Sequence, residues 1–157
     1  MYETINSPIN YGGLELKNRI IFAPTTFGLS DEEYLAKIRA IAQGGCAMII
    51  VGDVPVGKSK FEKSLFDKKG FAHYQKLVEI VHSYDCRICA QLHQTDSNML
   101  AMLKYVPGVL TKKISMEELR PLLNAEVAPY ISKLSTRKIH KIINGFGEAA
   151  ATAITWR

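Results

Sequence analysis

The stretch that most constrains the fold runs from Leu14 to Leu29, with the sequence LELKNRIIFAPTTFGL. Its centre, Ile20 to Ala23, is a continuous apolar run, which is typical of a strand buried on both faces in a parallel sheet. Pro24 has no N–H to donate to a strand ladder, so we expect the strand to end there. Thr25 and Thr26 follow at the carboxyl end of this strand, where ligands bind in parallel α/β folds.

Two more apolar runs follow, and a helical pattern precedes each of them. Ala47 to Val51 and Arg87 to Leu92 are the predicted strands, and Phe71 to Ser83 is the helix between them. Ser30 and Glu33 form a capping box that starts the earlier helix. Each crossover exceeds a dozen residues, so the strands are predicted to be parallel with right-handed connections.

Other segments flank this alternation of strands and helices. Apolar residues around Tyr11-Gly12-Gly13 predict an N-terminal β-hairpin. Residues 95–134 form a long excursion with turn signals at Pro107-Gly108 and one or two short helices, one of them started by a capping box at Ser115 and Glu118. A third helix follows Ser135, and a fourth strand would be expected where the sequence stops, at Arg157.

Composition and charge narrow the class of protein. The net charge is +5, but the basic residues are scattered, whereas a nucleic-acid-binding surface would cluster them. The charge does suit an anionic, phosphate-bearing cofactor. No apolar stretch reaches the roughly 18 residues of a membrane span, and the N-terminus does not resemble a signal peptide. The expected location is therefore the cytoplasm, with neither nucleic acid nor membrane as a partner.

The three cysteines do not predict a disulfide framework. Cys46, Cys86 and Cys89 are odd in number. Cys86 and Cys89 have the spacing of a redox or zinc pair, but a second ligand pair is missing. They also lead into a strand, where residues three apart face opposite sides. We therefore predict no metal site and no functional CxxC motif.

Three motifs in register with the strands resemble the N-terminal part of the old yellow enzyme family. They are KNRIIFAPTTF, GGCAMIIVGDV and AQLHQ, roughly forty residues apart. The resemblance extends to the last helix and implies an FMN-dependent NAD(P)H oxidoreductase on a TIM barrel. The expected fold class is therefore α/β: one incomplete barrel domain over residues 1–157, made of the N-terminal hairpin and the first three βα units and truncated before strand four.

The resemblance also implies which residues face the flavin ring. The turn after the first strand, Ala23, Pro24, Thr25 and Thr26, would lie against the ring, with Thr26 hydrogen-bonded near a flavin carbonyl. On the residues alone, a strand-end turn with satisfied hydroxyl groups is the favoured explanation of both threonines.

Two further cofactor contacts come from the later strands. Gln91 matches the family glutamine that pairs with the pyrimidine edge of the flavin, since an amide offers both a donor and an acceptor. Asp53 stands where the family has a small neutral residue, so it is either a flavin contact or a turn-capping carboxylate. The family arginine after His93 is absent, so His93 is a loop-edge residue or a ligand.

The parts of the family pattern that this chain lacks leave its function open. The substrate-anchoring residues and the phosphate-binding strands are not encoded, so no catalytic residue is assigned. FMN and NAD(P)H are partners by resemblance, and exposed strand edges predict self-association or a complementing chain. The alternatives are an oxidoreductase segment whose flavin site is only partly present, and an inert barrel fragment or self-associating interaction module that does not retain FMN.

Overall fold

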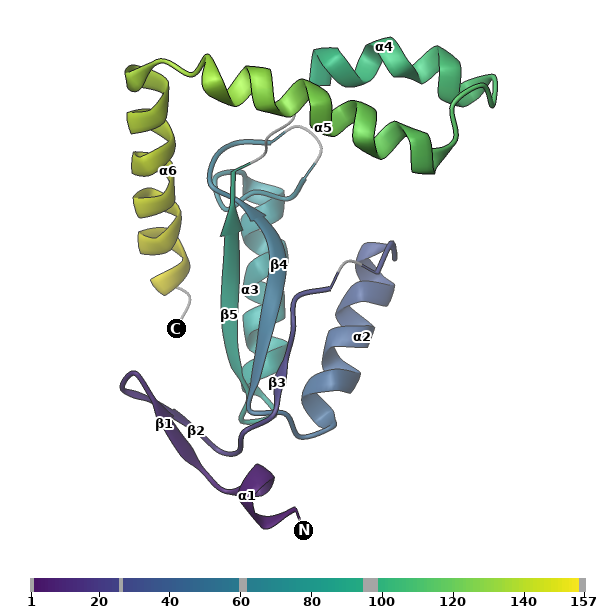
Figure 1. Ribbon diagram of the computed structural model, residues 1–157. Coiled ribbons are helices and arrows are strands. Elements are labelled where there is room, and N and C mark those ends of the chain that lie inside the picture. Colours follow the sequence, from purple (N-terminus) through teal and green to yellow (C-terminus); the bar gives the residue numbers. More distant parts are fainter. Residues whose placement is uncertain (1, 26, 60–61, 95–98, 156–157) are drawn as a thin grey trace. The chain divides into compact units, whose positions relative to one another are not determined.

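Three parallel strands form the main sheet of the protein, seen here in a computed structural model that describes residues 2–25, 27–59, 62–94 and 99–155 (Figure 1). In sheet order, which is also chain order, the strands are β3 (Ile21–Phe22), β4 (Met48–Pro55) and β5 (Arg87–His93). The connecting helices are α2 (Asp31–Gln43) and α3 (Lys68–His82). The predicted parallel pairing is confirmed: Phe22 aligns with Ile49, and Ile49 aligns with Ile88.

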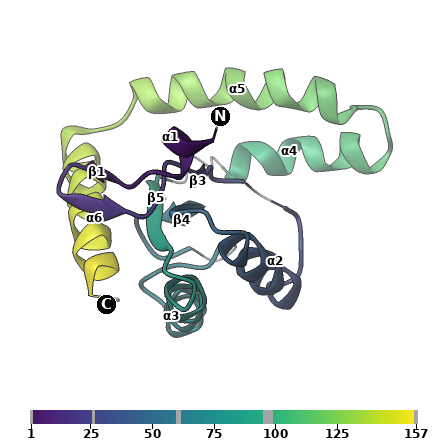
Figure 2. The same cartoon turned by 90° about the horizontal axis from the view of Figure 1, so that it is seen from below.

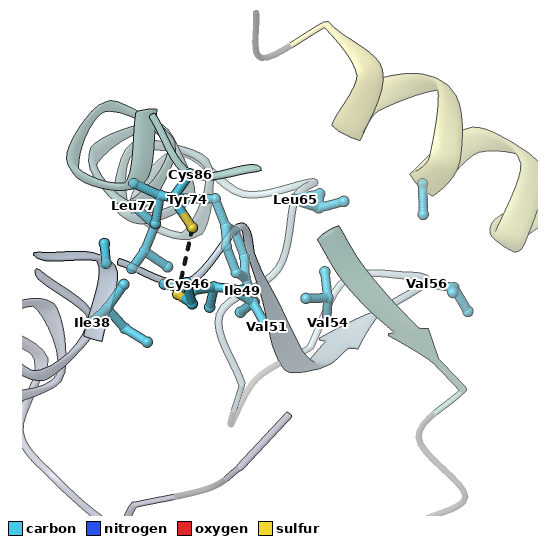
Figure 3. Packing of buried hydrophobic residues seen from close by; sticks show 13 residues of the cluster. Ile38, Cys46, Ile49, Val51, Val54, Val56, Leu65, Tyr74, Leu77 and Cys86 are labelled. Carbon is cyan, nitrogen blue, oxygen red and sulfur yellow. Dashed lines mark hydrogen bonds between the residues drawn. The ribbon is translucent and has the colours of Figure 1, made fainter. Parts of the chain in front are cut away.

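The core lies between this sheet and the two helices, which cover the same face of it (Figure 2). The central strand β4 supplies Ile49 and Val54, both fully buried, and α3 supplies Leu77 (Figure 3). Val81 of α3 is also fully buried in this core. Burying apolar side chains of this size stabilises the folded state by about 1.5–3 kcal/mol each.

The first strand differs from its prediction. β3 has two residues rather than the run from Arg19 to Ala23, and Ile20 and Ile21 are 43% and 45% exposed. Among the described residues β3 pairs only with β4, so no second strand lies beside it. The expectation of burial on both faces is therefore wrong for this strand.

The predicted N-terminal hairpin is confirmed. β1 (Ile9–Tyr11) pairs antiparallel with β2 (Leu14–Leu16), and the left-handed backbone of the turn is supplied by Gly12 and Gly13, with φ of 59° and 86°. A short helix, α1 (Glu3–Asn6), precedes the hairpin and was not predicted.

Residues 94–144 form a second compact unit, separate from the unit of residues 1–93 and 145–157. It contains α4 (Met99–Leu110) and α5 (Met116–Ser132), both longer than the short helices expected. The capping box of Ser115 and Glu118 is confirmed, but Pro107-Gly108 lies inside α4 rather than in a turn. An ion pair between Lys104 and Glu126 links the two helices.

The last helix, α6 (Thr136–Ile154), packs its second half on the main core through Ala149, which is fully buried. A Cβ at Gly145 would lie 2.7 Å from the carbonyl oxygen of Val56, whereas one at Gly147 would meet nothing within 4 Å.

These two glycines give a matched test of how α6 packs. Gly145→Ala should destabilise the protein by about 1–3 kcal/mol, because the backbone of Val56 must move. Gly147→Ala should stabilise it by roughly 0.5–1 kcal/mol through helix propensity alone. Urea unfolding of both variants measures the difference. Equal effects of the two substitutions would show that α6 does not pack on Val56.

Candidate functional site

The carboxyl ends of the three parallel strands meet at Gly52. A Cβ built on Gly52 would lie 3.1 Å from Cβ of Pro24, just after β3, and 3.4 Å from Oε1 of Gln91 in β5. A side chain at this position would therefore crowd Pro24, and glycine avoids that contact. The structure therefore brings Pro24, Gly52 and Gln91 together, and we call these three residues the strand-end junction.

The amide of Gln91 is the most available polar group of this junction. Its side chain is exposed, and it makes no side-chain hydrogen bond to another residue of the described segments. A free amide offers both a donor and an acceptor to a ligand.

The turn after β3 also lies at this end of the sheet. Ala23 and Thr25 are exposed, and Thr25 Oγ1 donates a hydrogen bond to the carbonyl oxygen of Ala23 at 3.3 Å. The hydroxyl of Thr25 thus already has the local partner that a strand-end turn provides. Thr26, the other predicted contact of this turn, lies outside the described residues.

Asp53 occupies an irregular position at the end of β4. The register of β4 and β5 shifts between Val51 and Val54, and Asp53 has a left-handed backbone with φ of 55°. A non-glycine residue in this conformation is uncommon and is often associated with function. The bulge re-aims the strand end, and Asp53 remains exposed.

A cavity of about 360 Å³ adjoins the junction, since Thr25, Gly52 and Asp53 contribute to its wall. Aromatic side chains make up much of the remaining wall: Phe27, Tyr34, His73 and Tyr74. Their rings follow one another at centroid distances of 5.5–6.1 Å. Such spacing is favourable for aromatic pairs, so these rings hold α2 and α3 together at this end of the sheet.

Burial controls the protonation of the rings in this wall. It raises the pKa of Tyr34, and the charge of Asp53 raises it further. Burial also raises the pKa of Tyr74, to a value well above the usual range. Burial lowers the pKa of His73, with Lys63 acting in the same sense. At neutral pH the aromatic wall is therefore uncharged.

The remaining histidine at this end is His93, the last residue of β5. Its Nε2 lies 3.6 Å from Oε1 of Glu62, and it is a buried atom without a hydrogen bond. No cluster of three or more metal-ligating side chains occurs within the described segments.

The cysteines contain a feature that the sequence analysis missed. Cys86 is buried and Cys89 exposed, as expected for residues three apart in a strand. The sulfur of Cys86 instead lies 3.7 Å from that of Cys46. The available signal was that each of these two cysteines stands just before an apolar run, on strands expected to be neighbours.

In the part of the chain that the structure describes, no helix combines the length and the apolar character that crossing a membrane requires.

Comparison with known proteins gives a consistent result. The model of the NADH:flavin oxidoreductase / NADH oxidase family matches residues 4–155. A bilirubin reductase of Clostridium symbiosum is 51% identical over 98% of this chain, and one of Mediterraneibacter gnavus is 28% identical over 93%. The chain spans 41% and 23% of these relatives' lengths.

Among solved structures, an old yellow enzyme from a Pichia species has the same fold over 97% of this chain, with a TM-score of 0.68. The sequence identity is 19%, and the match covers 43% of that enzyme.

Proposed function

Because the chain belongs to the NADH:flavin oxidoreductase / NADH oxidase family, we propose that it is the part of an FMN-dependent NAD(P)H oxidoreductase that faces the flavin ring. The main structural support for this proposal is the strand-end junction, where Pro24, Gly52 and Gln91 converge. In parallel α/β folds this end of the sheet is the place where ligands bind.

The residues present fit one side of a flavin. The absence of a side chain at Gly52 leaves the β4 backbone open to close approach, and Gln91 presents a free amide beside it. The two functions of that amide, donor and acceptor, match the alternating groups of a pyrimidine edge. When bound, the flavin would supply hydride transfer between NAD(P)H and an acceptor.

Each residue of the site has a separate part in this proposal. Gln91 binds the pyrimidine edge, and the turn of Ala23, Pro24 and Thr25 supports the ring. Thr26 is proposed as a further contact from the sequence resemblance alone. Asp53 is the exception, because a carboxylate close to the ring would disfavour an anionic reduced flavin.

The wider parts of the proposal rest on the relatives. We propose a partial TIM barrel for this chain, in the cytoplasm, with electrons taken from NAD(P)H. Because a bilirubin reductase is 51% identical, bilirubin is the first acceptor to test.

The open strands lead us to propose self-association or a complementing chain. β3 and β5 each have one neighbouring strand within the described segments, and Ile20 and Ile21 are exposed at the β3 edge. Edges of this kind pair with other strands. Gel filtration is expected to show a species larger than one chain, and a stable monomer at high concentration would contradict this.

FMN titration tests the central proposal. The chain should quench FMN fluorescence and gain melting temperature with FMN, and Gln91→Ala should weaken binding about tenfold. Two lost hydrogen bonds cost about 0.5–1.5 kcal/mol each, and about 1.4 kcal/mol corresponds to a factor of ten.

Gln75→Ala is the matched control, because Gln75 is an exposed glutamine on α3 and its replacement should leave FMN binding unchanged. A wild-type chain that neither quenches FMN nor gains melting temperature would contradict the proposal and favour the inert or self-associating alternative.

A further inference from the structure

Two buried thiols face each other at the amino ends of β4 and β5, the end of the sheet opposite the strand-end junction. The sulfur atoms of Cys46 and Cys86 are 3.7 Å apart, and the residues are 6% and 1% exposed (Figure 3). The backbone at this point is closely tied, because Arg87 N–H donates to the carbonyl oxygen of Ala47 at 2.8 Å. The two cysteines therefore come from backbone segments already held side by side.

We propose that Cys46 and Cys86 are a modification site, a dithiol that is oxidised reversibly to an intramolecular disulfide. A disulfide needs a sulfur–sulfur distance of about 2.05 Å, so the sulfurs must approach by about 1.7 Å, the difference from 3.7 Å. Rotation of the two side chains supplies a movement of this size. The proposal is independent of flavin binding.

Because the two thiols are buried, we expect their oxidant to be a small peroxide. One thiolate attacks a peroxide oxygen, the O–O bond breaks, and a sulfenic acid and one water form. The second sulfur then displaces the sulfenic oxygen as a second water, and the S–S bond forms. Two thiols and one hydrogen peroxide thus give one disulfide and two waters, with the thiols oxidised and the peroxide reduced.

The surroundings of the two sulfurs slow their oxidation. Burial, together with the neighbouring Cys46, raises the pKa of the Cys86 thiol to about 12, so Cys86 stays protonated at neutral pH. Since thiolate is the reactive form, we expect oxidation to take place slowly.

The disulfide would join the starts of two neighbouring strands and enclose β4 and α3. Closing a loop of this length restricts the unfolded chain, so the melting temperature should rise by at least about 5 °C.

The test uses the full chain with Cys89→Ser, which removes the exposed thiol. The folded protein is treated with hydrogen peroxide, unfolded and alkylated, and its mass is measured. We expect no alkylated cysteine, a mass lower by two hydrogen atoms, a linked Cys46–Cys86 peptide, and a raised melting temperature. Dithiothreitol should reverse the last three changes.

The control is Cys46→Ala in the same background, which should keep one alkylatable thiol and show no shift in melting temperature. Three results on the Cys89→Ser chain would overturn the proposal: two alkylated thiols, oxygen-bearing masses without a linked peptide, or chain-to-chain dimers on a non-reducing gel.

Discussion

Replacing Gly70 by alanine is expected to lower the free energy of unfolding by about 3 kcal/mol or more. A Cβ at Gly70 would overlap the backbone of Ser64, coming within 2.5 Å of its nitrogen and 2.9 Å of its carbonyl carbon, with the carbonyl oxygen also in conflict. Atoms of the main chain cannot rotate away as the end of a flexible side chain would, so a whole segment must move.

Burial and hydrogen bonds fix Ser64 in place, so it cannot move away from an added methyl group at Gly70. It is fully buried, its Oγ donates to the carbonyl oxygen of Gly57 at 2.7 Å, and its N–H donates to Oδ2 of Asp67 at 3.0 Å. The other oxygen of Asp67 accepts from Gly70 N–H at 2.7 Å and caps α3. These bonds hold the pKa of Asp67 below its usual range, the bond from Gly70 most of all. Moving Ser64 and Gly70 apart would therefore also break the helix cap.

Thermal and urea unfolding followed by circular dichroism measure this effect. A loss of about 3 kcal/mol corresponds to a melting temperature lower by roughly 6–12 °C for a chain of this size. Gly57→Ala is the matched control, because a Cβ there meets nothing within 4 Å. The control should change the free energy of unfolding by less than about 0.5 kcal/mol. A Gly70→Ala variant as stable as the control would show that α3 does not start against Ser64.

The sequence predicts best those features that depend on neighbours along the chain. Both capping boxes form as expected. Ser30 bonds with Glu33, and Ser115 with Glu118, across the first turn of a single helix, so neither pair needs a tertiary contact. The β-hairpin has the same local origin, in its two glycines. Family motifs add what local rules cannot, namely that strand ends far apart in sequence converge at Gly52.

Features that depend on what covers a segment could not be predicted in this way. The run from Ile20 to Ala23 has the composition of a buried strand, but composition does not tell whether both faces have neighbours. Cys46 and Cys86 meet only through the register of β4 and β5, which the sequence does not state. Pro107 lies inside α4, whereas the Pro-Gly dipeptide taken alone favours a turn.

The difference in burial between the apolar runs of β4 and β3 predicts the second large effect, a loss of stability. Ile49 is the second residue of the central strand β4 and is fully buried, with Phe22 and Ile88 as its partners on the two neighbouring strands. Ile49→Ala should cost about 3–5 kcal/mol, because it removes apolar contacts and leaves a cavity that a strand paired on both sides cannot close.

Ile21→Ala is the matched control, since it is the same substitution in the same sheet at a side chain that is 45% exposed. It should cost less than about 1 kcal/mol, because much of that side chain already contacts water. Urea unfolding of both variants gives the comparison, with equal slopes required for a valid difference. If Ile21→Ala proved as costly as Ile49→Ala, the β3 edge would be covered in solution, and the self-association proposed for this chain would be its most direct explanation.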